Sequence, residues 1–295
     1  MSTVPGGREP SAAGTREGHG RALRGKVVVI TGAAGGLGHA LAQAFAQVGA
    51  HVAALDRDAT ALAALARELE ATTRQHATVC LTAVCDVTRL DDCQGAMAQV
   101  CERLGGIDLL INNAGIVHRS AFADTQVDVL RRVMDVNFFG AVHCTHAALP
   151  SLRQRRGMLV AVSSVAGFSP LIGRTGYAAS KHALHGFFDS LRTELQGDGV
   201  DVLIVCPSFI DTGIDRAALG ADGQPAAQAR KTTGATTQPA DVARAILHAA
   251  QQRRPLLLFG FTAQAAWWLS RLWPTRYAAI MRKRLQSEIF PTTSH

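Results

Sequence analysis

The feature that most constrains this chain is a regular alternation of short, apolar, β-branched runs with longer helical patterns. Such alternation is typical of successive βαβ units that build a parallel sheet. Seven runs predict strands, at 26–31, 51–56, 78–86, 108–113, 158–164, 201–207 and 255–260. Helical patterns lie between them, at about 36–48, 58–74, 89–104, 125–154 and 176–196, and from 239 onward. Strands this apolar are expected to be buried on both faces. We therefore predict an α/β fold with a doubly wound, seven-stranded parallel sheet and right-handed crossovers.

Composition and length favour one large domain with appendages. The chain has 295 residues, of which 47% are hydrophobic and 18% charged, an ordinary globular composition. Residues 1–24 are rich in Gly, Ser, Pro and charge and contain no apolar stretch, so a disordered tail is predicted there rather than a secretory signal. Glu9 and Glu17 argue against a transit peptide. The catalytic domain is predicted at 25–260, with a helical extension at 261–295.

Cysteine usage and charge limit the compartment and the partners. The six cysteines form no Cys-x-x-Cys pair and lie in apolar surroundings, which favours a reducing, cytoplasmic setting. The net charge is +7, but the basic residues are scattered, so nucleic-acid binding is not expected. His143 and His146 share a helix face, yet no further ligand completes a site, and no metal is predicted.

A glycine-rich turn follows the first predicted strand. It reads Thr31-Gly32-Ala33-Ala34-Gly35-Gly36-Leu37-Gly38 and leads into a helix. Glycines there let the backbone approach a pyrophosphate, whose charge is stabilised by free N–H groups at the helix N-terminus. Asp56 ends the second strand, where a carboxylate can accept hydrogen bonds from ribose hydroxyls, although it could instead cap the next helix. The two features together predict a Rossmann-like dinucleotide site.

With these motifs in place, residues 25–260 resemble the classical short-chain dehydrogenase/reductase (SDR) superfamily. The turn fits the spacing T-G-x-x-x-G-x-G, Cys85-Asp86-Val87 is similar to the family's adenine-contacting step, and Asn112-Asn113-Ala114-Gly115 is similar to its N-N-A-G element. After the sixth strand the family commonly has Pro-Gly, whereas this chain has Pro207-Ser208. The resemblance assigns the following residues to the cofactor: Gly32, Gly36, Leu37, Gly38, Asp56, Arg57, Asp86, Val87, Asn113, Ala114, Gly115, Tyr177, Lys181, Pro207, Ile210 and Thr212.

Four residues carry the predicted catalysis. Tyr177 and Lys181 are spaced i and i+4 on one helix face, so that an ammonium can stabilise a phenolate and make Tyr177 a general acid and base. Ser164 lies thirteen residues upstream of Tyr177. By resemblance, Ser164 holds the substrate oxygen, Lys181 also binds the nicotinamide ribose, and Asn137 supports a water that relays protons.

The cofactor is predicted to be NAD, with NADP the weaker alternative. Asp56 repels a 2′-phosphate, whereas Arg57 beside it can attract one, and residues 33–35 lack the basic residue that NADP-preferring relatives often have. We therefore expect an NAD(P)-dependent oxidoreductase that interconverts a secondary alcohol and a carbonyl. Phe168, Leu171 and Phe209 favour an apolar substrate, such as a steroid, a retinoid or a long-chain compound.

Two other function classes stay open from the sequence. A redox-sensing nucleotide-binding regulator could use the same fold, and a sugar-nucleotide epimerase or dehydratase would retain the Tyr and Lys. A homodimer or homotetramer is expected.

The last 35 residues form a separate, basic and aromatic segment. All three tryptophans lie there, among five basic residues, in a pattern of two short amphipathic helices broken near Pro274. Three arrangements stay open: packing over the substrate cleft or a neighbouring subunit, peripheral attachment to a membrane surface, or an unattached surface helix. The uncharged run 255–270 is too short to span a bilayer.

Overall fold

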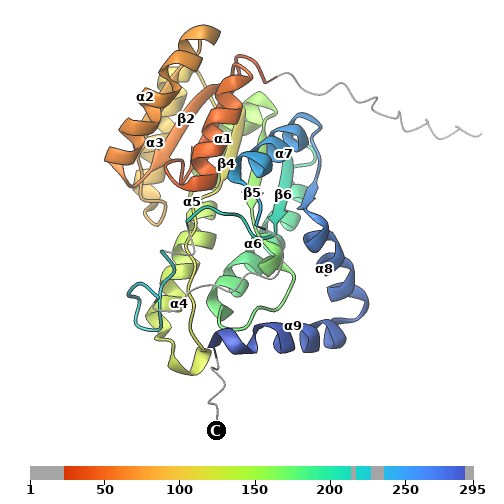
Figure 1. Cartoon of the computed structure of the whole chain (residues 1–295). Coiled ribbons are helices and arrows are strands. Elements are labelled where there is room, and N and C mark those ends of the chain that lie inside the picture. Colours follow the sequence, from red (N-terminus) through yellow and green to blue (C-terminus); the bar gives the residue numbers. More distant parts are fainter. Residues whose placement is uncertain (1–22, 214–216, 227–235, 290–295) are drawn as a thin grey trace, which may run out of the picture.

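The computed structural model describes residues 23–213, 217–226 and 236–289 (Figure 1). The predicted disordered tail, 1–24, therefore lies outside the described residues except for Leu23 and Arg24. Leu23 is buried and packs into the core. The predicted domain boundary at residue 25 stays a prediction.

A seven-stranded sheet forms the centre of the molecule, as predicted. Its strand order is β3-β2-β1-β4-β5-β6-β7, and every neighbouring pair is parallel. The strands are β1 (Val27–Thr31), β2 (His51–Asp56), β3 (Cys80–Val84), β4 (Leu109–Asn112), β5 (Met158–Val162), β6 (Asp201–Pro207) and β7 (Leu256–Phe259). Strand order reverses between β1 and β4, and in such sheets ligands bind beyond the carboxyl ends of the strands at that point.

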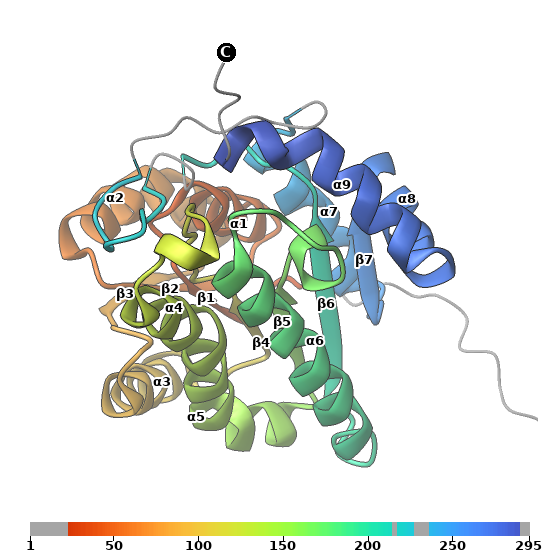
Figure 2. The same cartoon turned by 90° about the horizontal axis from the view of Figure 1, so that it is seen from below.

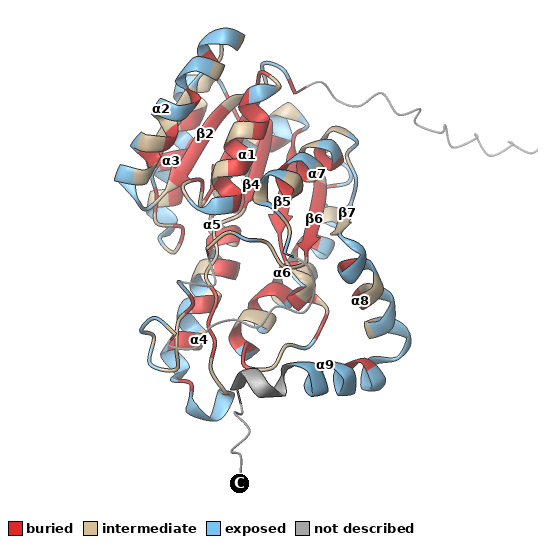
Figure 3. Ribbon diagram, viewed as in Figure 1, coloured by how far each residue is buried: buried red, intermediate tan, exposed pale blue. Residues whose placement is uncertain are grey.

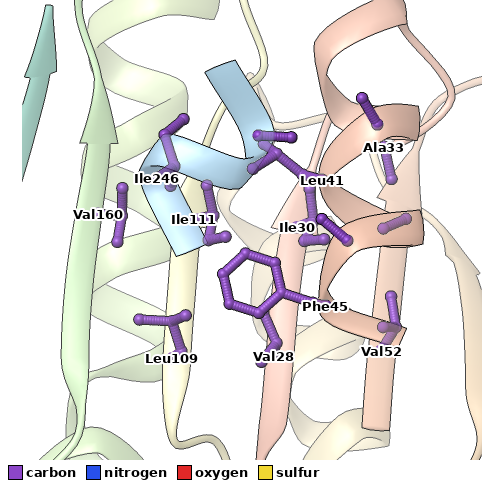
Figure 4. Close-up of a cluster of buried hydrophobic side chains, with 14 of the residues drawn as sticks. Val28, Ile30, Ala33, Leu41, Phe45, Val52, Leu109, Ile111, Val160 and Ile246 are labelled. Atoms are coloured by element: carbon purple, nitrogen blue, oxygen red, sulfur yellow. The ribbon is translucent and has the colours of Figure 1, made fainter. Parts of the chain in front are cut away.

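Helices cover both faces of the sheet (Figures 1 and 2). One face packs against α1 (Gly36–Gln47), α2 (Ala59–His76) and α7 (Pro239–Gln251). The other packs against α3 (Leu90–Leu104), α5 (Gly140–Arg155) and α6 (Thr175–Glu194). In the first layer, Phe45 and Leu41 of α1 lie against Val28 and Ile30 of β1, with Ile111 of β4 beside them (Figure 4). The apolar strands are thus enclosed between two hydrophobic layers.

The prediction of burial on both faces holds for the five inner strands and is wrong for the two edges. Every residue of β7 is half-buried, and β3 ends in Val84, which is 61% exposed. An edge strand has one neighbour only, and helices cover it incompletely. Burial is therefore set by position in the sheet, which composition does not reveal.

The long helix predicted over 125–154 is interrupted. It consists of α4 (Val127–Met134), a π-helical segment η2 (Asp135–Phe139) and α5. A short 3₁₀ turn, η1 (Phe122–Asp124), precedes α4. π-Helical turns are rare and frequently occur at functional sites, and this one contains Asn137.

Two helices follow β7, with the break where the proline predicted it. They are α8 (Phe261–Leu272) and α9 (Pro274–Ile289). Both lie at the end of the molecule toward which the strands point, and α9 runs across that end (Figure 1). Within the described residues, no helix is long and apolar enough to cross a membrane.

Candidate active site

A cavity of about 1060 Å³ lies at the carboxyl ends of the strands. The cavity is lined by every predicted cofactor-binding residue, from Gly32 to Thr212, and by three of the four predicted catalytic residues: Ser164, Tyr177 and Lys181. Asn137 does not line it. The fold thus brings together side chains that are separated by up to 180 residues in the sequence.

The glycine turn is packed too tightly for any other residue at three positions: Gly32, Gly36 and Gly38. A Cβ atom on Gly38 would lie 2.0 Å from the carbonyl oxygen of Gly32, and one on Gly36 would lie 2.8 Å from the carbonyl oxygen of Thr212. Contacts so short exclude a side chain. The loop after β6 therefore rests directly on the start of α1, and the N-terminus of that helix faces the cavity.

The ends of β1 and β4 are joined by a small hydrogen-bond network. The hydroxyl of Thr31 accepts from the backbone N–H groups of Asn113 (3.0 Å) and Ala114 (3.1 Å). The side-chain amide of Asn113 in turn donates to the carbonyls of Thr31 and Gly32. The predicted N-N-A-G element thus holds the glycine turn in place.

Asp56 and Asp86 form an acidic wall beside the glycine turn. The carboxylate of Asp56 accepts from the backbone N–H groups of Ala34 (3.1 Å) and Asp58 (3.2 Å). Partial burial raises the pKa of Asp86, but hydrogen bonds from Thr88 and the nearby charge of Arg57 outweigh this and hold it below its usual value. A narrow glycine cradle at a helix N-terminus, next to an oriented carboxylate, fits a dinucleotide.

Ser164 lies two residues after the end of β5 and caps the 3₁₀ turn η3 (Val165–Gly167). Its hydroxyl oxygen accepts from the backbone N–H of Ala166 at 3.1 Å. That bond uses an oxygen lone pair and leaves the hydroxyl proton to be donated. Ser164 can therefore donate a hydrogen bond to a substrate oxygen in the cavity.

Tyr177 and Lys181 occupy one face of the first turns of α6, as the spacing predicted. The ammonium nitrogen of Lys181 lies 5.7 Å from the centre of the Tyr177 ring and donates to the carbonyl of Val162 at 2.8 Å. Burial lowers the pKa of Lys181 to about 8, which still leaves the ammonium as the main form at neutral pH. A positive charge is thus held close to the phenol, where it stabilises a phenolate.

Asn137 is buried within η2, and its amide connects two backbone segments near the catalytic residues. Its oxygen accepts from Ile116 N–H at 2.8 Å, and its nitrogen donates to the carbonyl of Ile116 and to the hydroxyl of Ser180, both at 2.9 Å. Ser180 also donates to the carbonyl of Tyr177. Support for a proton-relaying water stays a prediction, since the structure places Asn137 behind the cavity wall.

His118, which the sequence did not indicate as a functional residue, contacts the helix that carries Tyr177. His118 is fully buried, and its Nε2 accepts from the backbone N–H of Gly176 at 2.9 Å. Burial, together with the charge of Arg174, lowers the pKa of His118 to about 4, so the ring is neutral and can accept. No pattern in the sequence distinguishes this histidine, because its hydrogen-bond partner Gly176 lies 58 residues away along the chain.

The C-terminal helices α8 and α9 pack against the segment that follows Ser164, a placement that the sequence left open. Trp267 of α8 contacts Phe168 edge to face, with ring centres 4.9 Å apart, and the guanidinium of Arg271 lies over the indole ring. Tyr277 of α9 is buried and shares a 2.8 Å hydrogen bond with Ser169. Both contacts reach the segment just after Ser164. Of the arrangements left open, these contacts favour packing over the cleft and exclude a fully unattached helix.

Comparisons with known proteins agree on one family. A short chain dehydrogenase family model matches residues 26–221. Dehydrogenase/reductase SDR family member 7B of Xenopus laevis is 38% identical over 283 residues, which cover 92% of this chain and 87% of that protein. A dehydrogenase/reductase SDR family protein 7-like of Anopheles gambiae is 38% identical over 271 residues, 90% of this chain and 85% of that protein.

A solved structure shares the fold. The alcohol dehydrogenase of the archaeon Thermococcus sibiricus, determined with 5-hydroxy-NADP, superposes with a TM-score of 0.65 at 24% sequence identity, covering 75% of this chain and 88% of that one. The family match spans most of the chain and includes the glycine turn, Ser164, Tyr177 and Lys181. The chain therefore belongs to the short-chain dehydrogenases, a family of NAD(P)-dependent oxidoreductases that act on CH–OH groups.

Proposed function

We propose that this enzyme interconverts an apolar secondary alcohol and its ketone with NAD(H). The observation that carries the proposal is the composition of the cavity at the carboxyl ends of the strands. Its lining includes Ser164, Tyr177 and Lys181 together with the glycine turn, and it also includes many apolar side chains. These include Leu171, Phe209, Phe261, Leu269, Ile280 and Met281. Apolar walls that converge on a few polar groups are typical of sites for hydrophobic small molecules.

Ser164, Tyr177 and Lys181 have separate roles at the substrate oxygen. The bound nicotinamide supplies the acceptor or donor of hydride, which is chemistry that no side chain provides. Ser164 donates a hydrogen bond to the substrate oxygen and fixes its position. Tyr177 takes the proton from the alcohol, or returns it to the carbonyl oxygen in reduction. Lys181 stabilises the phenolate that exists between these two states.

The preference for NAD(H) over NADP(H) rests on Asp56. Two backbone N–H groups hold its carboxylate at the cavity wall, where it can accept hydrogen bonds from the adenosine ribose. Arg57 also lines the cavity, but its charge acts on Asp86. A 2′-phosphate would meet the carboxylate of Asp56 and be repelled.

Replacing Tyr177 with Phe tests the catalytic assignment. The change removes the transferable proton, so kcat on an apolar ketone is expected to fall roughly 10²–10⁴-fold while the Kd for NADH stays within a few-fold. Tyr277→Phe is a matched control, since it removes the other tyrosine hydroxyl in the cavity and should retain most of kcat. Steady-state kinetics and NADH fluorescence titration measure the two quantities. Wild-type kcat in Tyr177→Phe would refute the assignment.

Replacing Asp56 with Ala tests the cofactor preference. Loss of the carboxylate removes the repulsion, so the ratio of kcat/KM for NADH to that for NADPH is expected to fall at least roughly tenfold. Asp58→Ala is the control, because Asp58 caps α2 through Ala61 N–H and does not line the cavity. A wild-type enzyme that prefers NADPH would show instead that Arg57 governs the choice.

A further inference from the structure

We propose that α8 and α9 dock this enzyme on the surface of an anionic lipid bilayer through their outer face. Large apolar side chains that are exposed to solvent are concentrated in these two helices. Twelve are exposed in the described residues, and six of them lie between 261 and 280: Phe261, Trp268, Leu269, Leu272, Trp273 and Ile280.

The two adjacent tryptophans of α8 have opposite environments. Trp267 packs on Phe168 and carries Arg271 on its ring, so it anchors the helix to the body. Trp268, one position further, is 62% exposed. The side of α8 that carries Trp267 therefore packs on the body of the protein, whereas Trp268 lies on the side that faces solvent.

The outer side of α8 forms a continuous apolar stripe. Phe261, Trp268 and Leu272 are spaced i, i+7 and i+11, which places them on one face of a helix. They are 84%, 62% and 58% exposed. Trp273 extends the stripe to the start of α9 with 52% exposure. Contiguous exposed apolar patches of this kind mark surfaces that bind another apolar phase.

The positive charge of residues 261–284 favours an anionic membrane as the binding partner. Residues 261–284 contain five basic side chains and no acidic one. Arg276, Arg282 and Lys283 of α9 are exposed, and none of them lines the cavity. Figure 3 shows both helices as largely exposed at one end of the molecule. Tryptophan and leucine beside arginine and lysine on short amphipathic helices are the residues that bind an anionic membrane interface.

The position of the cavity agrees with this orientation. Phe261, Leu269 and Ile280 are exposed and also line the cavity, as does Arg284. The same two helices thus form part of the cavity lining and also carry the proposed membrane face. A lipid-dissolved alcohol or ketone would reach the site from the bilayer, a consequence that rests on the proposed function, whereas docking itself does not.

Vesicle binding of the full chain, measured without substrate or cofactor, tests docking apart from catalysis. Wild-type protein is expected to float with vesicles of phosphatidylcholine and phosphatidylserine and to bind pure phosphatidylcholine vesicles much more weakly. Arg282→Gln combined with Lys283→Gln should weaken binding to the anionic vesicles roughly 25-fold. Trp268→Ala combined with Leu272→Ala should weaken it at least roughly tenfold.

Matched control variants distinguish binding through α8 and α9 from nonspecific binding of vesicles to any exposed charge or apolar side chain. Arg67→Gln with Arg103→Gln removes two exposed charges from α2 and α3, and Val84→Ala removes an exposed apolar side chain from β3. These variants should bind vesicles as the wild type does. Activity of the α8 and α9 variants on a water-soluble ketone should be unchanged, since none of the replaced residues lines the cavity.

Two results would overturn the proposal. One is the absence of wild-type binding to anionic vesicles. The other is an oligomer of the wild-type protein, detected by light scattering, that becomes a monomer when Trp268→Ala and Leu272→Ala are combined. The outer face of α8 would then be an interface between copies of the chain.

Discussion

At the residue scale, the active site depends on side chains that never touch a substrate. The amide of Asn137 fixes Ile116 and Ser180, and the imidazole of His118 holds the N–H of Gly176, one residue before Tyr177. Each bond joins segments that are far apart in the sequence. The catalytic tyrosine is therefore positioned from outside its own helix, and its placement is sensitive to distant substitutions.

His118→Ala is expected to destabilise the fold and to misplace Tyr177. It leaves the buried N–H of Gly176 without its acceptor, which costs about 1–3 kcal/mol of unfolding free energy, and kcat should fall roughly tenfold or more. His118→Gln places an amide oxygen near the position of Nε2 and should recover most of both losses. Urea denaturation and kcat measure the two effects. An alanine variant with unchanged kcat would show that the contact does not position Tyr177.

At the element scale, α8 and α9 act as a wall of the substrate site. Trp267 reaches Phe168, and Tyr277 reaches Ser169, so both helices are tied to the short segment after Ser164. The same helices contribute apolar residues to the cavity. The width of the site thus depends on how firmly these two helices are docked.

Trp267→Ala is expected to loosen that wall. The loss of the contacts with Phe168 and Arg271 should lower the unfolding free energy by about 2 kcal/mol, less than for a fully buried tryptophan. KM should rise more for bulky apolar ketones than for small ones. Trp268→Ala, at the exposed neighbouring position, should change neither quantity in the absence of lipid. Thermal unfolding and kinetics over a series of ketone chain lengths provide the measurement.

At the scale of the whole molecule, the fold buries the lysine that we propose stabilises the phenolate of Tyr177. Lys181 is 4% exposed, and burial lowers its pKa to about 8 from an ordinary value of 10.5. Between these two pH values the unfolded chain binds more protons at this residue than the folded one does. The unfolding free energy therefore rises with pH in this window, and the full penalty is present below pH 8.

Replacing Lys181 with Met tests this cost. The apolar variant has no ammonium to bury, so it should be more stable than the wild type near pH 7.5, by on the order of 3 kcal/mol, and the difference should shrink as the pH approaches 10.5. Denaturation of both proteins at several pH values, without cofactor, measures it. A pH-independent difference would mean that Lys181 is not buried as an ammonium. Activity should be lost in Lys181→Met at every pH.

The sequence by itself determined the order of strands and helices, the glycine turn, and the spacing of Ser164, Tyr177 and Lys181. These depend on local periodicity and on steric limits within a few residues, such as the exclusion of any Cβ at Gly38. The predicted cofactor-binding residues, all of which line the cavity, followed from the family resemblance that those motifs carried, whereas the order of the strands in the sheet was not predicted.

Only the tertiary structure decided the contacts that join distant segments. The π-helical turn around Asn137, the bond from Gly176 to His118, and the docking of Trp267 and Tyr277 each need a partner between 20 and 110 residues away. Residue type and periodicity describe one element at a time, so they cannot specify which side chains meet when separate elements pack. The proposed catalytic residues were therefore readable in the sequence, whereas the buried residues that contact their helix and the helices that complete the cavity were not.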